Sequence, residues 1–108
     1  MSEVITNNNE KSREALTALS QVNDPEIGLN IVDLGLVYQL DFDDENKKLY
    51  AAMTLTTQFC PMGNSIRSSA AVVLQQAFPG YEVLLEVVFE PAWTAARISD
   101  EGRQFLNR

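Results

Sequence analysis

The sequence has no histidine and a single cysteine, Cys60, among its 108 residues. Without histidine, one chain cannot supply a serine–histidine or cysteine–histidine catalytic pair. One thiol also falls short of the three or four protein ligands of a usual zinc site. A disulfide within the chain is excluded as well, which is typical of a protein kept in a reducing cytoplasm.

Basic residues are scarce too, with 8 lysines and arginines against 15 aspartates and glutamates, for a net charge of −7. They are scattered along the chain, so a nucleic-acid backbone would find no positive patch. No apolar run is long enough to cross a membrane. The first twelve residues have neither the basic start nor the apolar stretch of a secretory signal. We therefore expect a cytoplasmic protein with no nucleic-acid and no membrane partner.

The length and the 45% hydrophobic composition fit one globular domain. Residues 1–9 are predicted to be a polar N-terminal arm, and residues 10–108 a single α+β domain. Hydrophobic periodicity predicts helices at 10–22 and 62–77 and strands at 36–42, 49–56 and 82–90.

The first two strands are expected to form an antiparallel hairpin, and Ser99 to cap a short C-terminal helix. This order, helix-strand-strand-helix-strand, favours a two-layer fold. We predict an antiparallel-type sheet with both main helices on one face, plus the short C-terminal helix.

Cys60 lies in the stretch TTQFCPMG and is followed by Pro61. Proline is favoured at the first position of a helix, which would make Cys60 the N-cap. There the free backbone N–H groups and the helix dipole favour a thiolate over a thiol. Thr56 and Thr57 add two hydroxyls just before the cysteine. On spacing alone a packing role remains the better interpretation, because free cysteines are among the most buried residues.

Asp24-Pro25-Glu26 is a second candidate for chemistry. Two carboxylates two residues apart, held by a proline, could bind a cation or act as a base. The alternative is a helix end followed by two solvated acids, and local sequence alone favours that alternative.

Three stretches resemble the PaaD-like and SufT-like family of metal–sulfur cluster biosynthesis factors. They read DPEIGLNIVDLGLVY from Asp24, MTLTTQFCPMG from Met53 and PGYEVLLEVVFEPAWTAARISDEGR from Pro79. The likeness covers about residues 16–103. It implies the small α+β fold of iron–sulfur cluster assembly domains and a role in maturing iron–sulfur proteins.

The resemblance also implies a site in which separate segments converge on one pocket. The family's functional thiol, its acidic pair with the following apolar residue, and its paired hydroxyls fall on Cys60, Asp24, Glu26, Ile27, Thr56 and Thr57. Phe59 stands where many members have a small residue, often glycine. This departure from the family pattern would either narrow access to the thiol or rotate the loop that carries it.

An iron–sulfur cluster usually takes four protein ligands, mostly thiolates, and one chain offers one. We expect no stably bound cofactor. A cluster or iron would be held transiently at Cys60, shared across a homodimer, with a partner protein or with a small thiol. Acidic residues could assist, since iron tolerates carboxylate ligands. The expected partners are the iron–sulfur assembly machinery or apo client proteins.

Three functions stay open on these grounds. We favour a non-enzymatic assembly or maturation factor, a carrier or adaptor in which Cys60 is a labile metal or sulfur contact. The first alternative is a thiol-dependent enzyme with a helix-capped Cys60 nucleophile. The second is a protein-interaction module with a structural cysteine, which binds partners at exposed strand edges.

Overall fold

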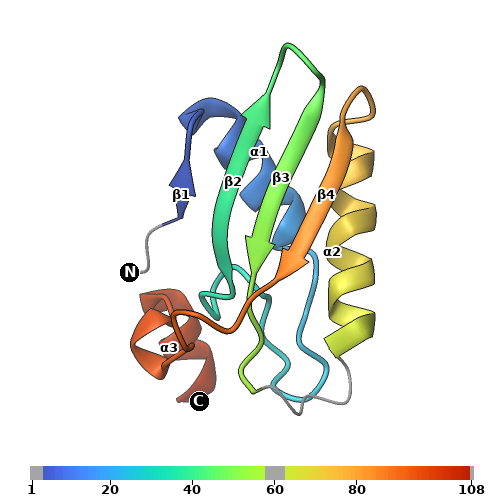
Figure 1. The fold of residues 1–108 in the computed structure, drawn as a ribbon. Coiled ribbons are helices and arrows are strands. Elements are labelled where there is room, and N and C mark those ends of the chain that lie inside the picture. The colour runs from blue at the N-terminus through green and yellow to red at the C-terminus, as the bar shows by residue number, and fades with distance from the viewer. Residues whose placement is uncertain (1–3, 58–62, 108) are drawn as a thin grey trace.

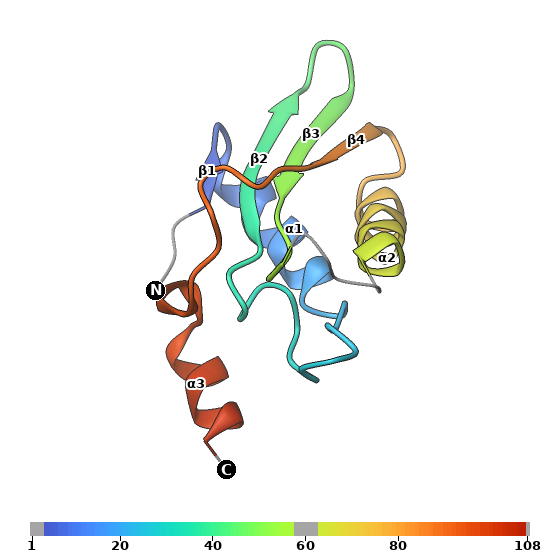
Figure 2. The ribbon, with the colours of Figure 1, turned by 60° about the horizontal axis from the view of Figure 1, so that its bottom comes forward.

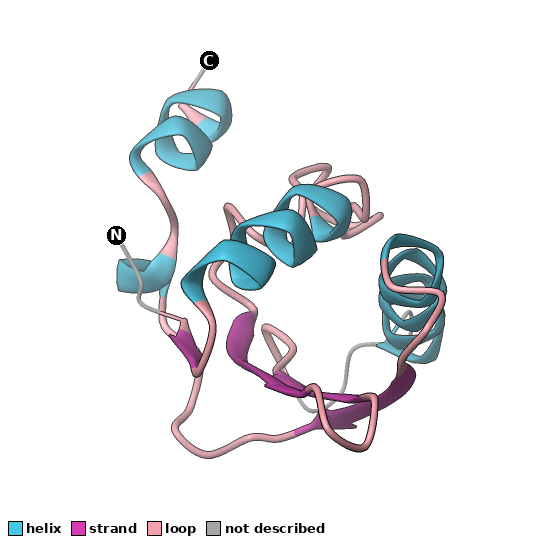
Figure 3. Cartoon of the chain, turned by 90° about the horizontal axis from the view of Figure 1, so that it is seen from above, coloured by secondary structure: helices cyan, strands magenta, loops and turns pink. Residues whose placement is uncertain are grey.

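The computed structural model describes residues 4–57 and 63–107 of the chain. A four-stranded sheet carries both longer helices on one face, and a short helix lies beyond its end (Figures 1 and 3). The predicted α+β class and the order of the main elements are confirmed. In chain order the elements are β1 (Ile5–Thr6), α1 (Asn9–Leu19), β2 (Val37–Asp43), β3 (Lys48–Met53), α2 (Gly63–Ala77), β4 (Glu82–Val87), the 3₁₀ turn η1 (Ala95–Arg97) and α3 (Asp100–Leu106).

The sheet is mixed, with the strand order β1-β2-β3-β4. The predicted hairpin is present, because β2 and β3 are antiparallel from Asp43 opposite Lys48 onward. The expectation of an antiparallel-type sheet holds only for this pair, since β4 runs parallel to β3 and β1 parallel to β2. The cause is the connection through α2, which carries the chain back along the helical face so that β4 starts beside the start of β3.

The core lies between the two longer helices and the sheet. Along β3, Leu49, Ala51 and Met53 are buried, whereas Tyr50 between them is exposed on the opposite face. This alternation is typical of a sheet with one covered face. The residues of α2 that complete the core lie at helical spacing, and they are Gly63, Ile66, Ala70 and Leu74. Within the described ranges, no helix is long and apolar enough to cross a membrane.

The segment before α1 is attached to the outer side of β2. Strand β1 pairs with Gln39 and Leu40. Beyond it, the Asn7 side-chain amide donates to the Phe42 carbonyl at 2.9 Å and accepts from the Phe42 N–H at 2.8 Å. Asn8 then caps α1 by accepting from the Lys11 N–H at 3.0 Å. The two-residue strand leaves no periodicity in the sequence, and it was not predicted.

The C-terminal segment is fixed to the loop that precedes β2. Trp93 Nε1 donates to the Leu34 carbonyl at 2.7 Å, and Arg97 Nε donates to the Gly35 carbonyl at 2.7 Å. The Arg97 guanidinium also stacks on the Tyr38 ring, 4.3 Å from its centroid. These contacts hold the segment between β4 and α3 across one end of the sheet.

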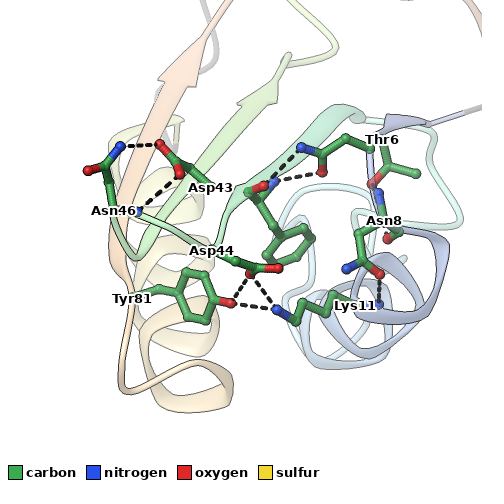
Figure 4. Close-up of polar contacts among 9 residues, drawn as sticks. Thr6, Asn8, Lys11, Asp43, Asp44, Asn46 and Tyr81 are labelled. Atoms are coloured by element: carbon green, nitrogen blue, oxygen red, sulfur yellow. Dashed lines mark hydrogen bonds and ion pairs between the residues drawn. The ribbon is translucent and has the colours of Figure 1, made fainter.

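Three side chains join the opposite end of the sheet to α1 (Figure 4). The Lys11 ammonium lies 2.5 Å from an Asp44 oxygen and 2.5 Å from the Tyr81 hydroxyl, which itself donates to Asp44. The hydrogen bonds from Lys11 and then from Tyr81 hold the pKa of the Asp44 carboxyl below its ordinary value. The bonds to Asp44 and Tyr81 raise the pKa of Lys11. The cluster ties α1 to the β2–β3 turn and to the start of β4.

Replacing Gly35 with alanine should lower the free energy of unfolding by about 3 kcal/mol. Gly35 has a φ of +76°, and a Cβ there would lie 2.4 Å from the Arg97 carbonyl oxygen. Gly28→Ala is the matched control, because Gly28 has a φ of +81° with nothing within 4 Å of the added carbon. It should cost only about 1 kcal/mol for the backbone. Urea unfolding measures both, and equal losses would contradict the close approach of Arg97.

Replacing Asp44 with asparagine should slightly lower the free energy of unfolding at pH 7. Because the pKa of Asp44 is depressed in the folded state, its contribution is present above the ordinary carboxyl pKa of about 3.9. It is lost as the pH falls through the lower folded-state pKa. Urea midpoints should therefore differ at pH 7, and the difference should shrink as the pH falls below the ordinary carboxyl pKa. Glu45→Gln removes an exposed acid of the same turn and should leave both midpoints unchanged.

Candidate functional site

The predicted site segments are gathered at one end of the molecule, where α2 begins (Figures 1 and 2). We call this end the site end. The loop between α1 and β2, which contains Asp24, reaches this end, and so does the chain that leaves β3. The two segments are joined near their bases, because the Thr54 N–H donates to the Leu36 carbonyl at 2.8 Å. The fold thus brings together stretches that lie about thirty residues apart in the sequence.

Asp24 is buried, with 2% of its surface exposed. Its Oδ1 accepts from the backbone N–H of Glu26 at 2.9 Å and of Ile27 at 3.3 Å. Its own carbonyl accepts from the Gly28 N–H at 2.7 Å, and its N–H donates to the Leu29 carbonyl at 2.9 Å. Asp24 therefore closes a tight turn from within, with its carboxylate bonded to the loop backbone.

The two acids of the predicted pair differ in their surroundings. Glu26 is exposed, whereas Asp24 is buried, so the structure does not show both carboxylates open to solvent. Ile27 is half-buried and packs against the core. Across residues 4–57 and 63–107, no three acidic or other metal-ligating side chains gather as a metal site.

The connection between β3 and α2 is closed at its base by a close contact. Leu55 and Gly63 are both buried, and a Cβ built on Gly63 would lie 2.7 Å from Leu55 Cδ1. The missing side chain of Gly63 therefore lets α2 start directly against the end of the strand segment. Leu55 and Gly63, which flank the seven residues 56–62 in the sequence, thus lie in contact with each other.

The predicted residues of this connection are described only in part. Thr56 is half-buried and Thr57 is exposed, so the two hydroxyl-bearing residues lie at the surface of the site end. Cys60 and Phe59 lie outside the described residues. In the sequence, Cys60 is three residues from Thr57 and three from Gly63.

Leu55 is the residue of this arrangement that the sequence analysis did not select. It continues the alternation of β3 and looks like an ordinary core residue. The signal that could have found the contact is Gly63, which is a poor helix former at the start of an otherwise regular helix. Among the described residues, the site end offers the exposed carboxylate of Glu26 and the hydroxyls of Thr56 and Thr57, all of which are oxygen donors.

Solved structures with the same fold share about a third of the sequence. A Domain of Unknown Function DUF59 from Bacillus anthracis superposes with a TM-score of 0.82 at 35% identity, over 92% of this chain and 98% of that one. A conserved hypothetical protein from Thermotoga maritima superposes with a TM-score of 0.75 at 36% identity, over 100% of both chains.

Similar proteins with a described role are maturation factors. The "Fe-S protein maturation auxiliary factor SufT" of Staphylococcus aureus is 40% identical over 78 residues, which are 72% of this chain and 88% of that protein. The auxiliary factor YitW of Bacillus subtilis is 37% identical over 82 residues, 76% of this chain and 79% of that protein. Residues 12–84 match the family model described as "Iron-sulfur cluster assembly protein". The chain belongs to this iron–sulfur cluster assembly family, within its SufT-like group.

Proposed function

We propose that the protein is a non-enzymatic factor in the maturation of iron–sulfur proteins, in which Cys60 makes a labile contact with metal or sulfur. The observation that carries the proposal is the likeness, over most of the chain, to two factors named for that role. The protein acts as a carrier or adaptor between the assembly machinery and apo client proteins.

The closed base of the 56–62 connection supports this role for Cys60. A short chain anchored at both ends by Leu55 and Gly63 limits the positions that its thiol can reach. Restricting a donor atom in this way lowers the entropy that binding must remove. In the proposed role, the thiol of this short connection makes the contact, and the hydroxyls of Thr56 and Thr57, which precede it in the sequence, assist.

The two acids take different parts in the proposed site. Asp24 is a positioning residue, because its buried carboxylate holds the turn that presents the next residues. Glu26 is exposed and is the carboxylate that can reach a metal ion. Ile27 packs the turn onto the core and fixes it relative to the site end.

The small number of metal ligands in one chain determines how iron or a cluster would be held. Since one chain brings one thiol and a cluster usually needs four ligands, the other ligands come from a partner, a small thiol or a second copy. Such sparse ligation favours transfer over storage. A reducing cytoplasm keeps the lone thiol available for this exchange.

Replacing Cys60 with serine should leave the fold intact and lower the activity of iron–sulfur enzymes in cells. The oxygen of serine is a poor substitute for a thiolate toward iron and sulfide. We expect the loss to be largest under high demand for iron–sulfur proteins, measured as aconitase-type activity against a wild-type strain. Urea unfolding of the purified variant controls for folding. Full enzyme activity with the serine variant would refute the role of Cys60.

Replacing Asp24 with alanine and Glu26 with glutamine should distinguish the residue that positions the turn from the residue that contacts the metal ion. The first leaves two backbone N–H groups without their buried acceptor and should cost about 2 kcal/mol of stability. The second changes an exposed side chain and should stay within about 0.5 kcal/mol of the wild type. It should nevertheless weaken the binding of ferrous iron, measured by anaerobic calorimetry. A stable Asp24→Ala protein, or unchanged iron binding in Glu26→Gln, would contradict these assignments.

A further inference from the structure

Strand β4 is an edge of the sheet over its whole length. The Glu82 N–H donates to the carbonyl of Lys47, just before β3, and the Val88 N–H donates to that of Met53 at the end of β3, both at 2.8 Å. Because alternate residues of a strand direct their backbone groups to opposite sides, Val83, Leu85 and Val87 direct theirs away from β3. No described strand pairs with that side. The register between β3 and β4 is regular, so Val83, Leu85 and Val87 offer hydrogen-bonding groups at three alternate positions to a further strand.

The opposite edge of the sheet is protected. There β1 pairs with Gln39 and Leu40, and the Asn7 side chain takes up both backbone groups of Phe42. A very short covering strand and a side chain that imitates a strand are devices that prevent edge pairing. Helix α2 packs beside β4, and from it the Arg67 side chain donates to the Leu85 carbonyl on the outer side of the strand at 3.4 Å. This long bond from an exposed side chain is easily replaced by a backbone N–H.

The side chains of β4 on the open face form an acidic pattern around an apolar centre. Glu82, Leu84 and Glu86 are exposed and alternate with residues that pack into the core. Leu84 is 36% exposed and lies beside Tyr50 of β3, which is 44% exposed. Both line a hollow of about 420 Å³, which Glu86 and the Arg67 side chain of α2 also line. A bound strand would meet acid, apolar and acid positions in turn.

The same pattern disfavours a second copy of the chain on this edge. Pairing β4 with itself would bring four glutamates, Glu82 and Glu86 from each copy, onto two adjacent strands. Like charges on facing strands are destabilising. The chain as a whole carries a net charge of −7, which adds to the repulsion. The charge pattern therefore selects for a basic partner and against self-association.

We propose that β4 is a docking edge that binds an extended, basic segment of a partner protein by strand addition. The segment carries lysine or arginine at two alternate positions, opposite Glu82 and Glu86, with an aliphatic or aromatic residue between them against Leu84 and Tyr50. Its backbone forms a ladder with Val83, Leu85 and Val87, and backbone hydrogen bonds supply affinity while alternate side chains supply specificity.

This edge also leads to the site end of the molecule. Because β3 and β4 are parallel, their final residues lie together, and the chain continues from β3 into the connection that contains Cys60 (Figure 1). An added strand would therefore extend toward the end of the molecule at which the chain leaves β3. The docking itself goes beyond that contact and does not require the thiol.

The test uses an acetylated, amidated seven-residue peptide with lysine, valine and lysine at alternate positions, separated by threonines. Binding is followed by amide NMR and hydrogen exchange of the ¹⁵N-labelled protein. We expect shifts centred on β4 and at least tenfold slower exchange of the Val83, Leu85 and Val87 amides. The double variant Glu82→Gln, Glu86→Gln should bind about tenfold more weakly, since two cross-strand ion pairs are lost. Both substitutions are on exposed side chains, and urea unfolding verifies that the fold persists.

Two matched peptides and one variant make the result decisive. Replacing both lysines by glutamates should abolish binding, and N-methylation of the ladder-forming amides should do the same although the charge is kept. The Cys60→Ser protein should bind like the wild type, which separates failure of docking from failure of the thiol's role. Equal binding of the N-methylated peptide, shifts away from β4, or no binding would overturn the proposal. So would concentration-dependent protection of β4 without peptide, which would make the edge a contact between copies.

Discussion

The packing of Leu55 against the bare backbone of Gly63 sets the arrangement of this half of the molecule. It joins the end of the β3 segment to the start of α2, so that the helix turns back at once along the covered face. Helix α2 then carries the chain back along the covered face, so that β4 runs parallel to β3. A bulkier residue at position 63 would push the helix start away and lengthen the span that the connection must cross.

The fold separates two kinds of surface. The site end has a buried carboxylate that shapes a turn, an exposed glutamate and two hydroxyl residues, arranged around a short connection. The β4 edge has backbone groups that pair with no described strand, and exposed glutamates flank them. One surface suits a brief exchange of metal or sulfur, and the other suits a longer contact with a chain of opposite charge. A carrier or adaptor needs both, because weak cargo contacts demand that the partner be held by other means.

The sequence predicted those parts of the fold in which local pattern and tertiary packing agree. The helix from Gly63 to Ala77 and the alternation of Leu49, Ala51 and Met53 follow directly from periodicity. Strand direction did not follow, because periodicity is the same for parallel and antiparallel pairs, and only the path through α2 decides it. The contact of Arg97 with Gly35 joins positions sixty-two residues apart and leaves no local signal.

The sequence could suggest which residues belong to the candidate site, but not how their side chains are buried and bonded. The DPE stretch lies in a tight turn, yet a carboxylate that caps its own loop and one that faces solvent look alike in sequence. Asp24 differs from Glu26 through burial and two backbone N–H groups, which depend on the closure of the 23–30 loop. Gly63 was visible as an irregular helix start, whereas its neighbour Leu55 was not.

The most direct measurement of the central claim is anaerobic reconstitution with iron and sulfide, followed by absorbance and native mass together for wild type and Cys60→Ser. The account predicts a chromophore and a matching mass increase in the wild type. Both should be lost when an apo acceptor protein is added and be absent from the serine variant. An identical chromophore and mass in the two proteins would contradict the assignment of Cys60 as the labile contact.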